Sequence, residues 1–291
     1  MSLSPPAASP LALAALILGA AAIALAPILV RLSDTSPTAS AFWRMALAAP
    51  VLWAWVFASE PERLSRRPGS WQLLGLAGLF FAADLGVWHY SIMFTSVANA
   101  TLELNFAPIF VTIGAWLLFR QRVKPLFLAA LAVTLTGAAV LIGPNVGGSG
   151  QALLGDGLGV LAGLFYGCYM LAIKSASTTV STARIVAVST TAGAIMLAPY
   201  AWLTAAQFFP QSPEGWLIVA AMALIPHVLG QSLIAYGFMQ LPASFSSLSL
   251  LTQPIFAAFY AWLLLNEILG MQHFLGGAIV LAGIYLAKRA S

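Results

Sequence analysis

Long apolar runs separated by short polar interruptions dominate this sequence. A helix needs about 20 apolar residues to cross the hydrocarbon core of a bilayer. Ten runs come close to that length, and each is bounded by charged residues, proline or glycine. They cover residues 11–31, 38–58, 71–93, 97–119, 125–143, 156–174, 183–204, 216–238, 243–265 and 271–287. The pattern therefore predicts an all-α integral membrane protein with ten transmembrane helices.

One apolar stretch occurs twice. Residues 108–118 read PIFVTIGAWLL and residues 254–264 read PIFAAFYAWLL, so seven of eleven aligned positions are identical at an offset of 146. A chain that repeats at half its length consists of two similar units. We expect one five-helix repeat in residues 1–148 and a second in residues 149–291. Because each repeat crosses the membrane an odd number of times, the second is expected to have inverted topology.

Composition supports the membrane assignment. The chain is 61% hydrophobic and 7% charged, whereas soluble domains carry roughly 25% charged residues. The net charge of +4 comes from twelve basic residues spread over many short loops, so nucleic acid is not expected as a partner. The expected partners are the lipid bilayer and a small-molecule substrate. The oligomeric state is open, with a monomer as one alternative.

The basic residues also indicate an orientation. Loops on the cytoplasmic side of a membrane carry an excess of Lys and Arg. With the N-terminus inside, ten of the twelve basic residues are cytoplasmic; Arg31 lies outside and Arg44 lies within the second helix. We therefore expect both termini in the cytoplasm of a bacterial-type inner membrane, and an external loop at Gly143–Gly155. Residues 1–10 contain no Lys or Arg, which favours a first transmembrane helix over a signal peptide.

Motifs for enzyme chemistry are absent from the sequence. It contains no G-x-S-x-G, no H-E-x-x-H and no nucleotide-binding G-x-x-x-x-G-K-[ST] pattern. The three histidines, His89, His227 and His273, lie in different predicted helices without the spacing of metal ligands. The single cysteine, Cys168, excludes a disulfide within the chain. We expect no catalytic residue, no metal site and no cofactor.

Charged side chains inside predicted membrane helices are costly and are therefore candidates for function. Arg44, Asp84 and Glu103 are expected at similar depths in the second, third and fourth helices. They could form a structural ion pair. Alternatively, a carboxylate could take up a proton during transport, or Arg44 could bind a substrate carboxylate through two hydrogen bonds. Proton coupling and facilitated diffusion are both compatible with the sequence.

Two prolines occupy equivalent positions in the repeated stretch. Pro108 and Pro254 lack an N–H, so the carbonyl groups of Leu104 and Leu250 are expected to lose their helical partners. Such paired breaks near the middle of the membrane could be simple kinks. Because they recur in both repeats, we interpret Pro108 and Pro254 as gating positions.

Polar and aromatic residues elsewhere indicate a cavity. Several hydroxyl-bearing residues precede Pro254, and two tyrosines lie deep in the sixth predicted helix. The alternative is that these groups hydrogen-bond within the bundle, which is common for a lone membrane histidine. The candidate substrate-binding residues are Asn99, Glu103, Tyr166, Tyr169, His227, Gln231, Ser244 and Gln253.

The two repeats, each with a P-x-x-x-x-x-x-x-W-L-L helix, resemble the drug/metabolite transporter superfamily of the EamA type. The strongest similarity is QPIFAAFYAWLLLNEILGMQHFLGGAIVLAGIYL. There, Glu267 occupies the acidic position that such repeats usually carry, whereas Gln121 stands at the aligned place in the first half. Within the family, LELNFAPIFVTIGAWLLF is similar to the fourth helix of bacterial aromatic amino-acid exporters.

The resemblance implies a secondary transporter that exports aromatic and other neutral amino acids, or related small metabolites, from the cytoplasm. It would work by alternating access through a central cavity between the inverted repeats. One alternative is export of other metabolites or drugs by the same superfamily. A membrane enzyme that acts on lipid is a further alternative, against which the missing catalytic motifs count.

Overall fold

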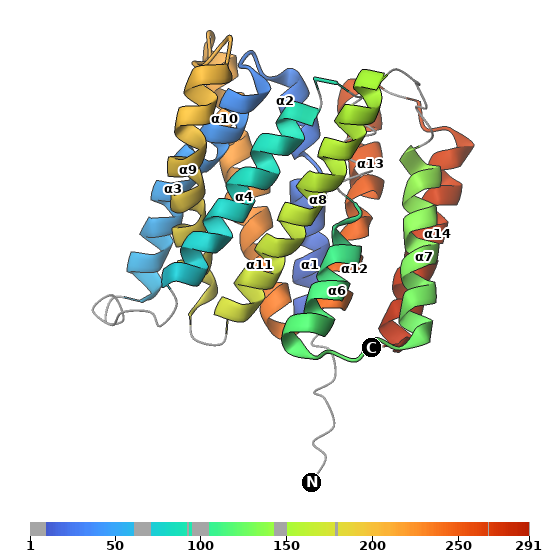
Figure 1. Cartoon of the computed structure of the whole chain (residues 1–291). Helices are drawn as coiled ribbons and strands as arrows, with labels where there is room; N and C mark the ends of the chain where they lie inside the picture. Colours follow the sequence, from blue (N-terminus) through green and yellow to red (C-terminus); the bar gives the residue numbers. More distant parts are fainter. Residues whose placement is uncertain are drawn as a thin grey trace.

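The computed structural model describes residues 10–60, 71–91, 93–94, 105–142, 150–177, 180–266 and 268–290. These residues form a helical bundle (Figure 1). The first half contains α1 (Pro10–Ile23), α2 (Ala26–Leu32), α3 (Pro37–Ser59), α4 (Trp71–Ser91), α6 (Ala107–Phe119) and α7 (Pro125–Ile142). The second half contains α8 (Gly150–Ala176), α9 (Thr182–Thr204), α10 (Pro213–Met222), η1 (Ala223–Gln231), α11 (Ser232–Gln240), α12 (Ala243–Ser249), η2 (Leu250–Thr252), α13 (Gln253–Leu265) and α14 (Met271–Ala290).

The helices match the lengths and apolar character of membrane spans. Within the described residues, eight spans are long and apolar enough to cross a bilayer, and two shorter apolar helices, α6 and α7, complete the set. Three of the eight spans are composite: α1 with α2, α10 with η1 and α11, and α12 with η2 and α13. No strand occurs in the described part of the chain. The predicted all-α membrane fold is confirmed.

Two details of the predicted helices differ from the structure. The first span, expected as one helix over residues 11–31, is interrupted at Ala24–Leu25 between α1 and α2. Pro27 explains the interruption, because it cannot donate a backbone hydrogen bond to the carbonyl of Ile23. The expected external loop Gly143–Gly155 is also too long, since α8 already begins at Gly150. The sequence QALL after Gly150 consists of good helix formers, which extend α8 toward the loop.

The copies α6 and α13 end in the same way. Each is followed by a residue in the left-handed conformation, Arg120 with a φ of 50° and Asn266 with a φ of 55°. The N–H groups of these two residues donate to the carbonyls of Ala115 and Ala261. Arg120 and Asn266 are separated by the repeat offset of 146. Figure 1 shows α6 and α13 toward opposite ends of the bundle, as an inverted repeat requires.

The packing of the helices follows the same symmetry. The extensive α7–α14 and α3–α9 contacts each join a helix of one half to its equivalent in the other. The α4–α8 contact is mirrored by the contact of α1 with α11, and the α4–α9 contact by that of η1 with α3. Exchanging the two halves therefore reproduces the same contacts. We call the end of the bundle where α1 begins and α14 ends the terminal end (Figure 1).

Glycine permits the closest of these contacts. A Cβ added to Gly137 of α7 would lie 2.6 Å from the backbone nitrogen of Val280 in α14. A Cβ added to Gly283 of α14 would lie 2.8 Å from the backbone nitrogen of Thr134 in α7. The two contacts are equivalents across the repeat. In lipid, where hydrophobic burial does not drive helices together, such backbone approach supplies much of the packing energy.

Substituting Gly137 should therefore weaken the α7–α14 contact. Gly137→Ala places a methyl group against backbone atoms that cannot rotate away, and overpacking of this kind costs about 1–3 kcal/mol. We expect a lower melting temperature for the detergent-purified protein. Gly75→Ala in α4 is the matched control, because a Cβ there meets nothing within 4 Å. Equal melting temperatures for the two variants would contradict the role given to Gly137.

Candidate substrate site

A cavity lies between the two halves of the bundle. Its empty volume, including the open space at its mouth, is about 860 Å³. Residues of both halves line it: Ile23, Ala24, Ala26, Pro27, Arg44, Phe81, Asp84, Leu85, Trp88, Asn105, Ala107, Pro108, Tyr166, Met170, Gln231, Ser247, Leu250, Leu251, Gln253, Pro254 and Ala257.

Three interruptions of the helices meet at this cavity. The break between α1 and α2 contributes Ile23, Ala24, Ala26 and Pro27, and the first turns of α6 and α13 contribute Pro108 and Pro254. The carbonyl of Leu250 has no α-helical partner at Pro254, but it is not free, because it accepts a hydrogen bond from the Gln253 N–H in the tight turn η2. Leu104, its counterpart, lies outside the described residues. Irregular backbone is tolerated at membrane depth where it lines a cavity.

Two opposite charges share the cavity. Arg44 of α3 and Asp84 of α4 both line it, with 5% and 4% of their surfaces exposed. Each acts electrostatically on the other. Nevertheless, Arg44 Nε and Asp84 Oδ1 have no hydrogen-bond partner among the described residues. Both groups therefore keep hydrogen-bonding capacity for a ligand. Glu103 and Asn99, the other predicted polar candidates of this region, lie outside the described residues.

Aromatic rings form the adjoining wall. Phe81 stacks on Tyr169 with ring centroids 4.5 Å apart and on His227 at 5.4 Å, and Tyr166 stacks on Tyr169 at 6.1 Å. Of these four residues, Phe81 and Tyr166 line the cavity. Tyr169 and His227 are fully buried and support the wall from behind. His227 is held in place by a 2.8 Å hydrogen bond between its Nε2 and the hydroxyl of Thr190.

Of the remaining predicted site residues, two line the cavity and one does not. Gln231 and Gln253 line the cavity. Ser244 is buried at the start of α12 and is not among the lining residues; Ser247, one turn later, lines the cavity instead. Sequence reasoning did not assign Phe81, Trp88 and Met170 to the site. In the sequence, Trp88 resembles a tryptophan of the membrane interface, because it lies near a helix end. Only its burial in the structure distinguishes it from such an interfacial residue.

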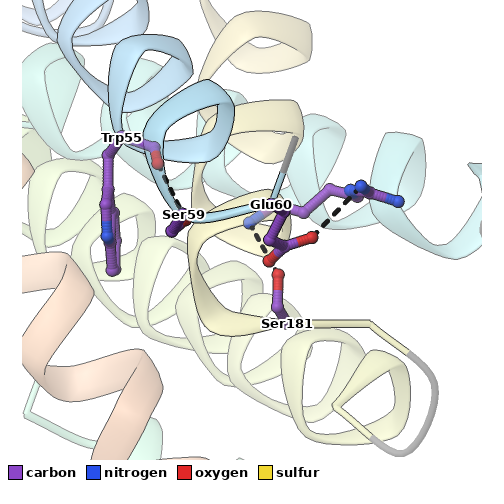
Figure 2. Close-up of polar contacts among 5 residues, drawn as sticks. Trp55, Ser59, Glu60 and Ser181 are labelled. Atoms are coloured by element: carbon purple, nitrogen blue, oxygen red, sulfur yellow. Dashed lines mark hydrogen bonds and ion pairs between the residues drawn. The ribbon is translucent and has the colours of Figure 1, made fainter. Parts of the chain in front are cut away.

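The terminal end of the bundle is held together by charged side chains. Lys174 at the end of α8 donates from Nζ to the carbonyl oxygens of Phe238 (2.7 Å), Met239 (3.2 Å) and Leu241 (2.9 Å). Glu60, at the end of α3, lies beside the start of α9 at Ser181 (Figure 2). Its Oε2 is 3.1 Å from a guanidinium nitrogen of Arg184. These contacts join α8 to α11 and α3 to α9 below the cavity.

The site has the composition of a binding site for an organic molecule. Among the described residues, no three His, Cys, Asp or Glu side chains are grouped as a metal site would require. Inverted helical repeats around a central cavity with buried polar groups are the architecture of membrane transporters. The chain belongs to the EamA-like transporter family, which matches it twice, over residues 9–143 and 153–289.

Relatives and a solved structure agree with this class. An uncharacterized transporter of Archaeoglobus fulgidus is 25% identical over 262 residues, covering 88% of this chain and 89% of that protein. The uncharacterized transporter YetK of Bacillus subtilis is 24% identical over 205 residues, covering 68% of this chain and 61% of that protein. A protein of known crystal structure superimposes with a TM-score of 0.81, at 18% identity and 98% coverage of both chains, which shows a shared fold. The chain is accordingly a multi-pass membrane transporter rather than an enzyme.

The contribution of the Thr190–His227 hydrogen bond to the stability of the protein can be tested. Thr190→Val removes the partner of His227 Nε2, and the other ring nitrogen, Nδ1, already lacks one. A buried polar group left unpaired costs about 1–3 kcal/mol, so the melting temperature in detergent should fall. Thr136→Val is the control, because the exposed Thr136 hydroxyl bonds only to the Ala132 carbonyl of its own helix. A fall no larger than that of Thr136→Val would show that the bond does not stabilise the wall.

Proposed function

We propose that this protein is a secondary transporter that exports aromatic and other neutral amino acids from the cytoplasm. The observation that carries the proposal is the cavity itself, which combines an aromatic wall at Phe81 and Tyr166 with the unsatisfied polar groups of Arg44 and Asp84. Neutral amino acids with aromatic side chains present both kinds of surface. A drug or lipid substrate would not need two buried opposite charges.

Alternating access is the proposed mechanism of this transport. The cavity is bounded on two sides by the proline-containing first turns of α6 and α13, which run in opposite directions as equivalents of the inverted repeat. Movement at Pro108 would be matched by movement at Pro254, because the two repeats exchange roles when the cavity opens to the other side. Pro108 and Pro254 are therefore the proposed gating positions.

Transport in a defined system tests the proposed function. Liposomes that contain the purified protein should take up radiolabelled Phe, Trp or Thr with saturable kinetics, and excess unlabelled amino acid should compete. Empty liposomes are the control, and size-exclusion chromatography verifies that the protein is folded. Uptake no faster than in empty liposomes would overturn the assignment of amino acids as substrates. The EamA family membership would stand.

The proposed orientation places the terminal end in the cytoplasm of the inner membrane. Seven basic residues of the described chain belong to that end: Arg120, Arg122, Lys124, Lys174, Arg184, Lys288 and Arg289. Arg31, at the end of α2, belongs to the opposite end. This asymmetry agrees with the preference of basic residues for the cytoplasmic side.

Reporter fusions test the orientation. Fused after Ser291, a green fluorescent protein should be fluorescent and an alkaline phosphatase inactive, because the latter folds only outside the cytoplasm. Fusions within the loop between α9 and α10, at Gln207, are the opposite control and should give active phosphatase. The reverse result at both sites would place the terminal end outside.

A further inference from the structure

Arg44 and Asp84 place opposite charges on the described lining of this cavity, and each keeps one atom without a hydrogen bond. Neither Arg44 Nε nor Asp84 Oδ1 has a hydrogen-bond partner among the described residues, although each residue is at least nine-tenths buried. A buried polar atom without a hydrogen-bond partner is costly. A ligand that supplies one cation and one anion would satisfy both groups, whereas a ligand with a single charge would leave one unpaired.

The two charges lie at about the same depth. Arg44 is seven residues from Pro37, where α3 begins, and Asp84 is seven residues from Ser91, where α4 ends. At 1.5 Å per residue both are about 10 Å from the helix ends opposite the terminal end. Since both line the cavity, they face it from neighbouring helices at one level.

The aromatic wall lies deeper than the charges. Phe81 is three residues before Asp84, one turn of α4 further from the helix end at Ser91, on the same helix face. It lines the cavity together with Tyr166 and Met170 of α8. The site therefore combines the charged level at Arg44 and Asp84 with the Phe81 ring one turn below it, and Gln231 and Gln253 also line the cavity.

From this arrangement we propose that Arg44 and Asp84 form a clamp for a zwitterion. The Arg44 guanidinium binds the α-carboxylate, the Asp84 carboxylate binds the α-ammonium group, and the side chain of the substrate contacts Phe81, Tyr166 and Met170. This inference rests on the proposed function for its substrate class and assigns the recognition of both charges to the first repeat. It excludes peptides with blocked ends, simple amines and simple carboxylic acids as good substrates.

Binding to the purified protein tests the clamp separately from transport. The probes are Phe, Trp and Thr, each compared with its methyl ester, which lacks the carboxylate, and its N-acetyl form, which lacks the ammonium group. The measurement is the concentration of each probe that half-saturates the rise in melting temperature in detergent. We expect both modified forms to bind at least 10-fold more weakly than the free amino acid that binds best.

Variants assign each charge to its residue. Arg44→Gln should weaken binding of the free amino acid about 10-fold or more and leave the methyl ester nearly unchanged. Asp84→Asn should also weaken binding of the free amino acid about 10-fold or more, and it should leave binding of the N-acetyl form nearly unchanged. Arg44→Lys is the matched control, which keeps the charge and should retain discrimination against the ester. If a variant does not fold, the comparison of probes on the unmodified protein still tests the clamp.

Each outcome separates the clamp from the proposed function. Equal binding of free and modified amino acids, or no binding of any, overturns the clamp. Transport of amino acids that is equally competed by the esters overturns the clamp and leaves the proposed function intact. Selective binding of free amino acids without transport in liposomes supports the clamp and overturns the exporter.

Discussion

In a bilayer, backbone groups cannot find water, and this constraint decides where the chain is able to depart from regular helix. Every N–H and C=O within the hydrocarbon core must be satisfied inside the protein or face a cavity. The break at Ala24–Leu25 and the turns before Pro108 and Pro254 all meet the same cavity. The irregular backbone and the binding space therefore depend on each other. A substrate site is possible where the helices break, and the breaks are tolerated because the site is there.

Close packing elsewhere permits these interruptions. The α7–α14 contact joins the two halves through Gly137 and Gly283, each against the backbone of the other helix. At the terminal end, Lys174 caps carbonyls at the end of α11, and Glu60 pairs with Arg184. Of the helices that carry breaks, α12 and α13 contact α14, whereas α1 packs mainly against α11 and η1.

Much of this fold could be predicted from the sequence, because its signals are long. Twenty-residue apolar runs define membrane helices, and the PIF…AWLL repeat shows that the two halves are related. Local features of the helices were harder to predict from the sequence. The interruption of the first span depends on one residue, Pro27, and the π-helix η1 over Ala223–Gln231 has no hydropathy signal. The place of Phe81 in the site was not predicted. In an apolar helix, the sequence does not distinguish an apolar residue that faces lipid from one that faces a cavity.

The relation between symmetry and chemistry explains why the repeat alone could not reveal the site. Under the offset of 146, Phe81 is equivalent to His227, and these two rings stack on one another where the halves meet. The charged positions have no charged equivalents: Arg44 corresponds to Thr190 and Asp84 to Gly230. The scaffold is therefore two-fold, whereas the two charges that could recognise a ligand come from one half. An α-amino acid is itself asymmetric, with a cation, an anion and a side chain, so a fully symmetric cavity could not hold it in one orientation. Loss of symmetry at these positions is what a single, oriented substrate requires.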